Sequence, residues 1–194
     1  MYWTQTDGDA AIVKGGMDGT GLQVLRKEGI GSPSSIAVIN SRVYWVDIPR
    51  ERIEFVYADG GRHGILPASK HTYLVPQRIA IYKDELYWVG RAKDESYDTV
   101  LKRSPPASVD DHILAGNLTR VTGLSICGYG SQVQSRKNDC APGHPCAGIC
   151  LLSNRDSFRC VCPIGFESDG SSCRGDLINY YPFDPKDITF VPLL

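Results

Sequence analysis

Short apolar runs separated by polar turns recur through the first two thirds of the chain. Ile36-Ala37-Val38 leads into the polar turn Asn40-Ser41-Arg42, which leads into Val43-Tyr44-Trp45-Val46. Residues 79–89 repeat this order, with the polar turn at residues 82–85. Two β-rich runs around a short polar turn are typical of a β-hairpin. The pattern therefore predicts at least two hairpins of similar sequence.

The hairpins belong to a longer repeat. All three tryptophans follow a tyrosine, at Tyr2-Trp3, Tyr44-Trp45 and Tyr87-Trp88, with intervals of 42 and 43 residues. A fixed period in this range indicates a propeller or a solenoid. Asp18-Gly19 and Asp59-Gly60 predict turns downstream of the first two pairs, each followed by a short apolar strand. One unit therefore has about four short strands, as a propeller blade does.

All seven cysteines lie after residue 126. Six of the seven lie within 34 residues, at Cys140, Cys146, Cys150, Cys160, Cys162 and Cys173. A segment this short rarely folds without covalent or metal staples, and three disulfides would supply them in an oxidising compartment. Spacing alone leaves 15 connectivities open. A zinc site that uses His144 is the weaker alternative, because paired C-x2-C knuckles are absent from the sequence.

The spacing C-x5-C-x3-C-x9-C-x-C-x10-C, together with Phe158 and Gly165-Phe166, resembles an EGF-like module. The resemblance implies three disulfides: Cys140–Cys150, Cys146–Cys160 and Cys162–Cys173. Calcium-binding modules of this kind carry an Asn or Asp where this chain has Ser153. Asn138 and Asp139 precede the first cysteine, but in a different arrangement. We therefore expect no metal here.

The repeat units resemble the YWTD repeat of the low-density lipoprotein receptor family. They read YWTQ at residues 2–5, YWVD at 44–47 and YWVG at 87–90. The resemblance implies that the fourth-position carboxylate joins neighbouring strands and blades, and only Asp47 retains it. The sequence contains no Trp-Asp dipeptide, which argues against the WD40 class. A propeller followed at once by an EGF-like module is the arrangement of that receptor family.

The resemblance implies an all-β chain with three parts. Residues 1–131 would form the C-terminal part of a propeller, with about three of six blades, and residues 138–175 the EGF-like module. Residues 176–194 would open a following propeller, although a disordered tail is the alternative. We also expect Gly123-Leu124-Ser125-Ile126 to form the innermost strand of the closing blade. An open arc of blades exposes apolar faces, so we expect the isolated chain to be poorly stable.

Several residues are candidates for sites. Asn117-Leu118-Thr119 is an acceptor for an N-linked glycan. Cys127 is expected to be a free thiol, buried in the closing strand, although pairing with a distant cysteine is the alternative. The Tyr-Trp pairs are expected in the core rather than on a ligand platform. Asp110-Asp111-His112 is expected in a solvated loop.

The four histidines of the chain do not indicate a site. His63, His71, His112 and His144 are all expected in turns without a cluster, so a pH switch is not assigned to any of them.

The remaining features exclude several function classes. With 22 acidic and 21 basic residues, the net charge of -1 gives no drive toward nucleic acid or anionic membranes. No apolar run approaches the ~20 residues of a membrane span, and Met1 is not followed by a leader pattern. Motifs of hydrolases, phosphate loops and metal helices are absent from the sequence, and no cofactor is expected. The inner-strand runs also lack the polar groups that a propeller enzyme would need.

The favoured interpretation is a non-catalytic, extracellular ligand-binding or spacer segment of an endocytic lipoprotein- or vitellogenin-type receptor. The parent would be a single-pass membrane receptor, with a protein or lipoprotein as the ligand and the rest of the receptor chain as the other partner. The alternative is a propeller–EGF protein-binding module of a signalling co-receptor or a basement-membrane scaffold.

Overall fold

The computed structural model describes residues 1–127, 138–153 and 157–174, and it is built from antiparallel β-sheets. The only helix in these ranges is a three-residue 3-10 turn, η1 (Ile48–Arg50). The all-β class predicted from the repeats is therefore confirmed. No helix of the described part is long and apolar enough to cross a bilayer.

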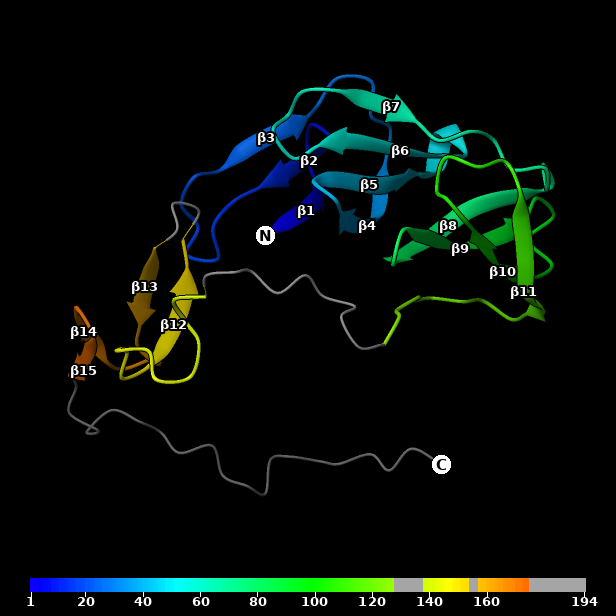
Figure 1. Ribbon diagram of the computed structural model, residues 1–194. Helices are drawn as coiled ribbons and strands as arrows, with labels where there is room; N and C mark the ends of the chain where they lie inside the picture. Colours follow the sequence, from blue (N-terminus) through cyan, green and yellow to red (C-terminus); the bar gives the residue numbers. More distant parts are fainter. Residues whose placement is uncertain (128–137, 154–156, 175–194) are drawn as a thin grey trace, which may run out of the picture.

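Three sheets occupy the repeat region (Figure 1). The first holds β1 (Tyr2–Gln5), β2 (Ala11–Lys14) and β3 (Gln23–Arg26). The second holds β4 (Pro33–Ile39), β5 (Arg42–Asp47), β6 (Arg52–Tyr57) and β7 (His63–Ile65). The third holds β8 (Leu74–Tyr82), β9 (Glu85–Ala92), β10 (Asp98–Arg103) and β11 (Asp111–Leu118). In each sheet the strands pair in chain order, so each is a meander of the kind that forms a propeller blade.

The two predicted hairpins are present, and their turns explain their polar sequences. Asn40 and Ser41 connect β4 to β5 with φ values of 47° and 58°, and Lys83 and Asp84 connect β8 to β9 with φ values of 47° and 60°. Two central residues with positive φ are the mark of a type I′ turn, whose twist matches that of the flanking strands. Asn40 Nδ2 also donates a hydrogen bond to Asp84 across the two sheets.

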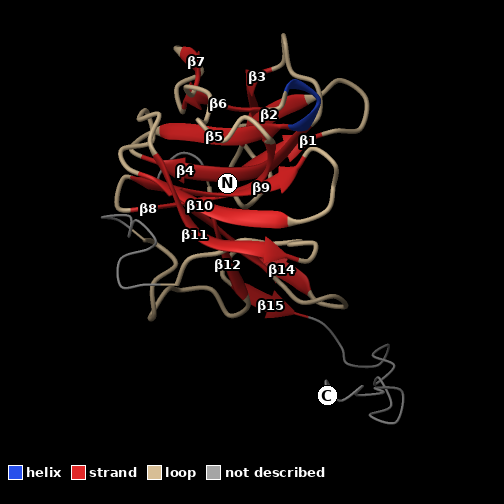
Figure 2. Cartoon of the chain, turned by 90° about the vertical axis from the view of Figure 1, so that its right-hand side faces the viewer, coloured by secondary structure: helices blue, strands red, loops and turns tan. Residues whose placement is uncertain are grey.

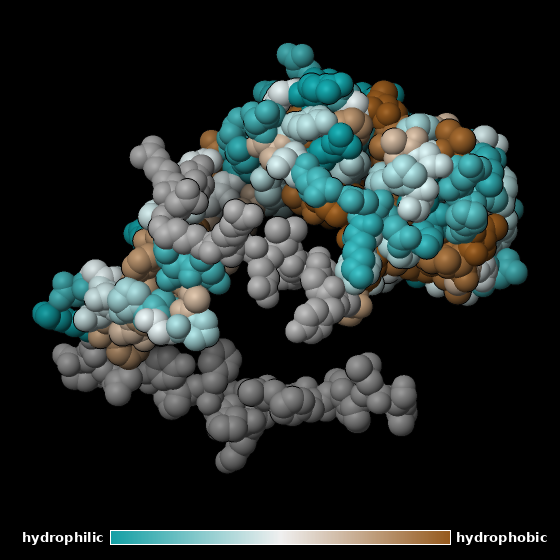
Figure 3. Space-filling view, viewed as in Figure 1, coloured by the Kyte–Doolittle hydropathy of each residue, from teal (hydrophilic) through white to brown (hydrophobic). Residues whose placement is uncertain are grey.

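The sheets follow one another along an arc, with β4 beside β8 on its inner side (Figure 1). Figure 2 shows strands of neighbouring sheets one above another. Ser35 joins the two inner strands directly, because its Oγ accepts a hydrogen bond from the Ile79 amide at 2.9 Å and donates one to the Ile79 carbonyl at 3.3 Å. The arc does not close within the described residues. Figure 3 shows hydrophobic surface on its concave side.

The Tyr-Trp pairs form the contacts between sheets. Successive side chains of a strand point to opposite faces, so Trp45 packs toward the first sheet with Ile12 and Leu25, whereas Tyr44 packs toward the third. Trp88 in turn packs toward the second sheet. Tyr44, Trp45 and Trp88 are at most 2% exposed, so these aromatic rings belong to the core, as expected. Tyr2, Trp3 and Tyr87 are half-buried.

The cysteine-rich part forms two small hairpins. Its strands are β12 (Ile149–Leu152), β13 (Phe158–Val161), β14 (Glu167–Asp169) and β15 (Ser172–Arg174). The three disulfides join Cys140 to Cys150, Cys146 to Cys160, and Cys162 to Cys173. This is the pairing that the EGF-like resemblance implies. A disulfide-stapled pair of hairpins is consistent with a module that has little apolar core of its own.

One expectation about the end of the repeat region is wrong. Residues 119–127 form no strand, and Cys127 is a free thiol that is exposed rather than buried. Leu124 and Ile126 alternate with exposed residues, but no neighbouring strand pairs with this segment in the described part. Without a partner strand on that side, the segment has nothing to bury Cys127 against. The proposed strands in 176–194 lie outside the described residues.

Candidate functional site

A buried ion pair lies at the junction of the second and third sheets. Asp111 begins β11 and is 3% exposed, and Arg103 ends β10 and is 2% exposed. The guanidinium donates to both carboxylate oxygens, at 2.7 Å from Nε and 2.8 Å from Nη2. The expectation of a solvated Asp110-Asp111-His112 loop is therefore wrong for Asp111, because a charged partner one strand away makes its burial possible.

Two further groups donate hydrogen bonds to the Asp111 carboxylate. Trp88 Nε1 donates to Asp111 Oδ1 at 3.1 Å, and Ser69 Oγ donates to Oδ2 at 2.6 Å. Burial by itself raises the pKa of Asp111, but the hydrogen bonds from Arg103, Ser69 and Trp88 outweigh burial and hold that pKa below its ordinary value. Asp111 is therefore a fixed anion at neutral pH.

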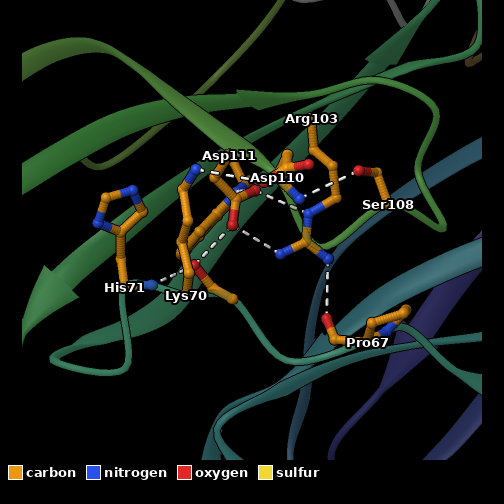
Figure 4. A network of polar contacts seen from close by, with 9 residues as sticks. Pro67, Lys70, His71, Arg103, Ser108, Asp110 and Asp111 are labelled. Carbon is orange, nitrogen blue, oxygen red and sulfur yellow. Dashed lines mark hydrogen bonds and ion pairs between the residues drawn. The ribbon is translucent and has the colours of Figure 1, made fainter.

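The same network holds the connection between the two sheets. Arg103 Nη1 donates to the Pro67 carbonyl at 2.8 Å, and Ser69 Oγ accepts from the His71 amide at 2.9 Å (Figure 4). Pro67, Ser69 and His71 all lie between β7 and β8. Pro67 and Ser69 are thus bonded to β10 and β11, and His71 is bonded to Ser69 within the linker, so the linker is held to the third sheet.

A cleft of about 290 Å³ adjoins this network, and Pro67, Ser69 and Arg103 belong to both. Its apolar walls include Ile53, Leu66 and the ring of Trp88, and Arg103 contributes to its base. The complete lining is Arg50, Glu51, Arg52, Ile53, Ile65, Leu66, Pro67, Ala68, Ser69, Pro76, Trp88 and Arg103. The cleft therefore combines apolar walls with three arginines and one carboxylate, Glu51, and it belongs to two sheets rather than one.

Two arginines stand at the cleft with their side chains about one third exposed. Arg50 Nη1 lies 3.1 Å from Asp47, and Arg52 Nε donates to Glu54 at 2.8 Å. Both carboxylates are fully buried, whereas the guanidiniums reach solvent. The buried anions thus fix the position of two cations at the surface.

The second and third sheets use different polar groups beside their tryptophans. The strand registers place His63 where the third sheet has Asp111, and Glu54 where the third sheet has Leu101. His63 Nε2 lies 2.6 Å from Glu54 Oε2, and its ring stacks on Trp45 at 6.0 Å between centroids. His63 and His112 therefore lie on strands, not in turns as expected.

Asp47 retains the role that the resemblance implies. Its carboxylate accepts hydrogen bonds from the amides of Gly31 at 2.8 Å and Ser32 at 3.4 Å, in the linker between the first two sheets. At the matching position of the third sheet, Gly90 has no room for a side chain, because a Cβ there would lie 2.7 Å from the Trp88 ring and 2.8 Å from Leu74.

A different carboxylate holds the next linker. Asp98 on β10 is 1% exposed and accepts a hydrogen bond from the Val121 amide at 2.6 Å. Arg91 binds both of its oxygens, at 2.9 and 3.2 Å, and this ion pair lowers the pKa of Asp98. Sequence reasoning missed Asp98 because it lies outside the four-residue motif. The only indication in the sequence is that Asp98 begins the strand that follows the Gly90 strand.

The cysteine-rich part contacts the first sheet. The Met17 amide donates to the Leu152 carbonyl at 2.8 Å, and the hydroxyls of Thr20 and Ser153 lie 3.4 Å apart. A second cavity, of about 330 Å³, lies at this contact and is lined from both sides. The β2–β3 turn is thus the point where the two parts of the described chain meet.

The remaining candidates are separate from the cleft. Asn117 is exposed on β11, and Cys127 is exposed beyond it. The ligating atoms of His144, Cys146 and Cys150 lie within 4.8 Å of one another, but both sulfurs are held in disulfides and are not available to a metal.

Comparisons with known proteins agree on one group of receptors. The vitellogenin receptor Yl of Drosophila melanogaster is 29% identical over 171 residues, which cover 85% of this chain and 8% of that protein. Low-density lipoprotein receptor-related protein 5 of Mus musculus is 26% identical over 169 residues, with 84% and 10% covered. The vitellogenin receptor of Solenopsis invicta is 24% identical over 179 residues, with 90% and 10% covered. The chain spans about a tenth of the length of these relatives.

No family model matches the chain. Among solved structures, a chain in the crystal structure of a nidogen/laminin complex matches with a TM-score of 0.48 and 22% identity, over 63% of this chain and 45% of that chain. Over most of its length, the chain is similar to low-density lipoprotein receptor-related and vitellogenin receptors, as the Tyr-Trp repeats and the six cysteines predict.

Proposed function

We propose that this chain is a non-catalytic, ligand-binding segment of the extracellular part of an endocytic receptor for a lipoprotein or a vitellogenin-type protein. The observation that carries the proposal is the cleft between the second and third sheets. The receptor relatives support the assignment to this class of protein. The disulfides support an extracellular location, because such bonds persist in oxidising compartments.

The chemistry of the cleft suits a protein ligand. Its volume and apolar walls fit one or two apolar side chains, and Arg50 and Arg52 favour an acidic neighbour in the same ligand segment. An apolar centre beside fixed charges is a common design of protein interfaces. The network of Arg103 and Asp111 keeps the base of the cleft in place, so little ordering is needed on binding.

The rest of the proposal concerns the parent protein. In it, residues 1–131 act as part of a propeller and residues 138–175 as an EGF-like module, which together present the cleft and space it from neighbouring modules. The parent is a single-pass membrane receptor, and this segment itself binds neither nucleic acid nor membrane. The balanced charge of the chain supports the exclusion of nucleic acid.

The alternative function is a protein-binding module of a signalling co-receptor or a scaffold. The match to low-density lipoprotein receptor-related protein 5 favours keeping this alternative beside the vitellogenin receptors. Both functions use the same cleft, and they differ in the fate of the complex. Uptake of labelled ligand into acidic vesicles would support the endocytic role, whereas binding without uptake by the parent receptor would support the alternative.

Binding of purified vitellogenin to the immobilised 194-residue chain tests the proposal. Ile65 is 48% exposed at the cleft, so Ile65→Glu places a charge against its apolar wall. We expect surface plasmon resonance to show at least a tenfold weaker binding for this variant than for the unchanged chain.

Val24→Glu is the matched control. Val24 is 54% exposed on β3, the strand of the first sheet that corresponds to β7, and it lies outside the cleft. This variant should bind vitellogenin as the unchanged chain does. Equal losses in the two variants, or no binding by a chain whose three disulfides have been verified, would contradict the proposal.

A further inference from the structure

The strand β11 ends in an irregularity that sets Asn117 apart from the sheet. Asp98 pairs with Leu118 and Val100 with Ala115, so two residues, Gly116 and Asn117, stand opposite Thr99. Asn117 has a φ of 53°, which asparagine adopts more readily than most residues. A bulge of this kind redirects a side chain away from the ladder. Asn117 is exposed, and so is Thr119 two residues later.

The position of this bulge in the sheet is as informative as its shape. β11 is an edge strand, paired only with β10 among the described residues. Ile113 and Leu114 on the same strand are 52% and 53% exposed. An exposed edge with apolar side chains is a template for pairing with another chain. Leu114 and Asn117 are three positions apart along β11, which spans on the order of 10 Å at most.

We infer that Asn117 carries an N-linked glycan that shields the free edge of β11. Asn117-Leu118-Thr119 is the only Asn-x-Ser/Thr triplet in the chain. The inference rests on the proposed function in one respect, since it requires passage through the secretory pathway. It adds a modification site and a role for it, both remote from the cleft.

The donor is a lipid-pyrophosphate-linked oligosaccharide. Asn117 Nδ2 forms a bond to C1 of the first sugar, while the bond between C1 and the pyrophosphate oxygen breaks. The amide loses one proton and the lipid pyrophosphate leaves, so no oxidant or reductant is needed. The bulky, polar glycan then stands beside the edge strand and hinders its pairing with another chain.

The first test is the occupancy of Asn117. The chain is directed into the secretory pathway of cultured cells with a cleavable leader, and the peptide that contains Asn117 is analysed by mass spectrometry before and after enzymatic removal of N-linked glycans. We expect the unchanged chain and Thr119→Ser to carry the glycan, and Asn117→Gln and Thr119→Ala to lack it. An unmodified Asn117 in the secreted, unchanged chain would overturn the inference.

The second test concerns shielding. Light scattering compares the secreted chain before and after the glycan is removed under native conditions. We expect removal to increase self-association severalfold, and we expect the double variant Ile113→Lys, Leu114→Lys to abolish that increase. Equal self-association with and without the glycan would overturn the shielding role.

The two proposals fail separately. Absence of the glycan together with a selective loss of vitellogenin binding by Ile65→Glu would refute the glycan and leave the cleft. A glycan at Asn117 with no vitellogenin binding would refute the cleft as a vitellogenin site and leave the glycan.

Discussion

At the scale of single residues, the polar core between the second and third sheets depends on charged residues whose burial the sequence does not predict. Asp111 follows another aspartate in a polar stretch, and its neighbour Asp110 is indeed exposed, with a 70% exposed side chain. Only the pairing of β10 with β11 brings Arg103 to Asp111. Two adjacent aspartates therefore have opposite roles, because Asp111 is the first residue of β11 and pairs with Arg103, whereas Asp110 lies before the strand.

We expect Asp111→Asn to destabilise the chain by about 3–5 kcal/mol, because it leaves the buried charge of Arg103 without a partner. Urea unfolding followed by tryptophan fluorescence measures the change, since Trp88 contacts this carboxylate. Asp110→Asn is the matched control and should leave the midpoint unchanged. Similar midpoints for both variants would show that the ion pair contributes little.

Asp111→Asn should also change how the stability of the chain depends on pH. The pKa of Asp111 is lower in the folded chain than its ordinary value, so this carboxylate stabilises the fold above its ordinary pKa, and that stability is lost as the pH falls through the lowered value. Asp111→Asn should therefore lose less stability than the unchanged chain between about pH 5 and the acid end of the transition.

At the scale of elements, the linkers between sheets are held by carboxylates that project from strands. Asp47 holds the linker before β4, Asp98 holds the segment after β11, and Asp111 holds the linker before β8 through Ser69. The YWTD resemblance predicts the first of these. The other two carboxylates come from different strands of the third sheet. Asp111 holds the linker that precedes its own sheet, as Asp47 does, whereas Asp98 holds the segment that follows its sheet.

Asp47→Ala tests this principle. Loss of the hydrogen bonds to a charged group should cost about 1.5–3 kcal/mol and should speed amide exchange at Gly31 and Ser32. Hydrogen exchange with mass spectrometry localises the effect. Asp59→Ala is the control, because its carboxylate accepts from Gly61 within its own turn and should alter exchange only there. Unchanged exchange in the linker after Asp47→Ala would contradict the role of this carboxylate.

At the scale of the whole molecule, a backbone hydrogen bond from the Met17 amide to the Leu152 carbonyl joins the disulfide-stapled part to the first sheet. The Gly19 amide bonds to the Gly16 carbonyl, so residues 16–19 form a β-turn with Met17 at its second position. Proline is favoured at that position. A proline there removes only the amide that reaches Leu152.

We therefore expect Met17→Pro to release the cysteine-rich part while the turn is retained, because the Leu152 carbonyl loses its donor. Hydrogen exchange should rise in β12, and the hydrodynamic radius should increase. Met17→Ala keeps the amide and serves as the control. If both variants behave alike, the contact does not depend on this bond.

The sequence by itself determined the strand class, the repeat period, the hairpins and the aromatic core, because these follow from local alternation and turn chemistry. It also located the cysteine cluster and, through the resemblance, the receptor group that the relatives confirm. Only the tertiary structure decided which polar residues are buried, because Asp111, Glu54 and Asp98 each depend on a partner from another strand. The cleft also depends on the tertiary structure, since residues about one repeat apart meet there only when two sheets pack side by side.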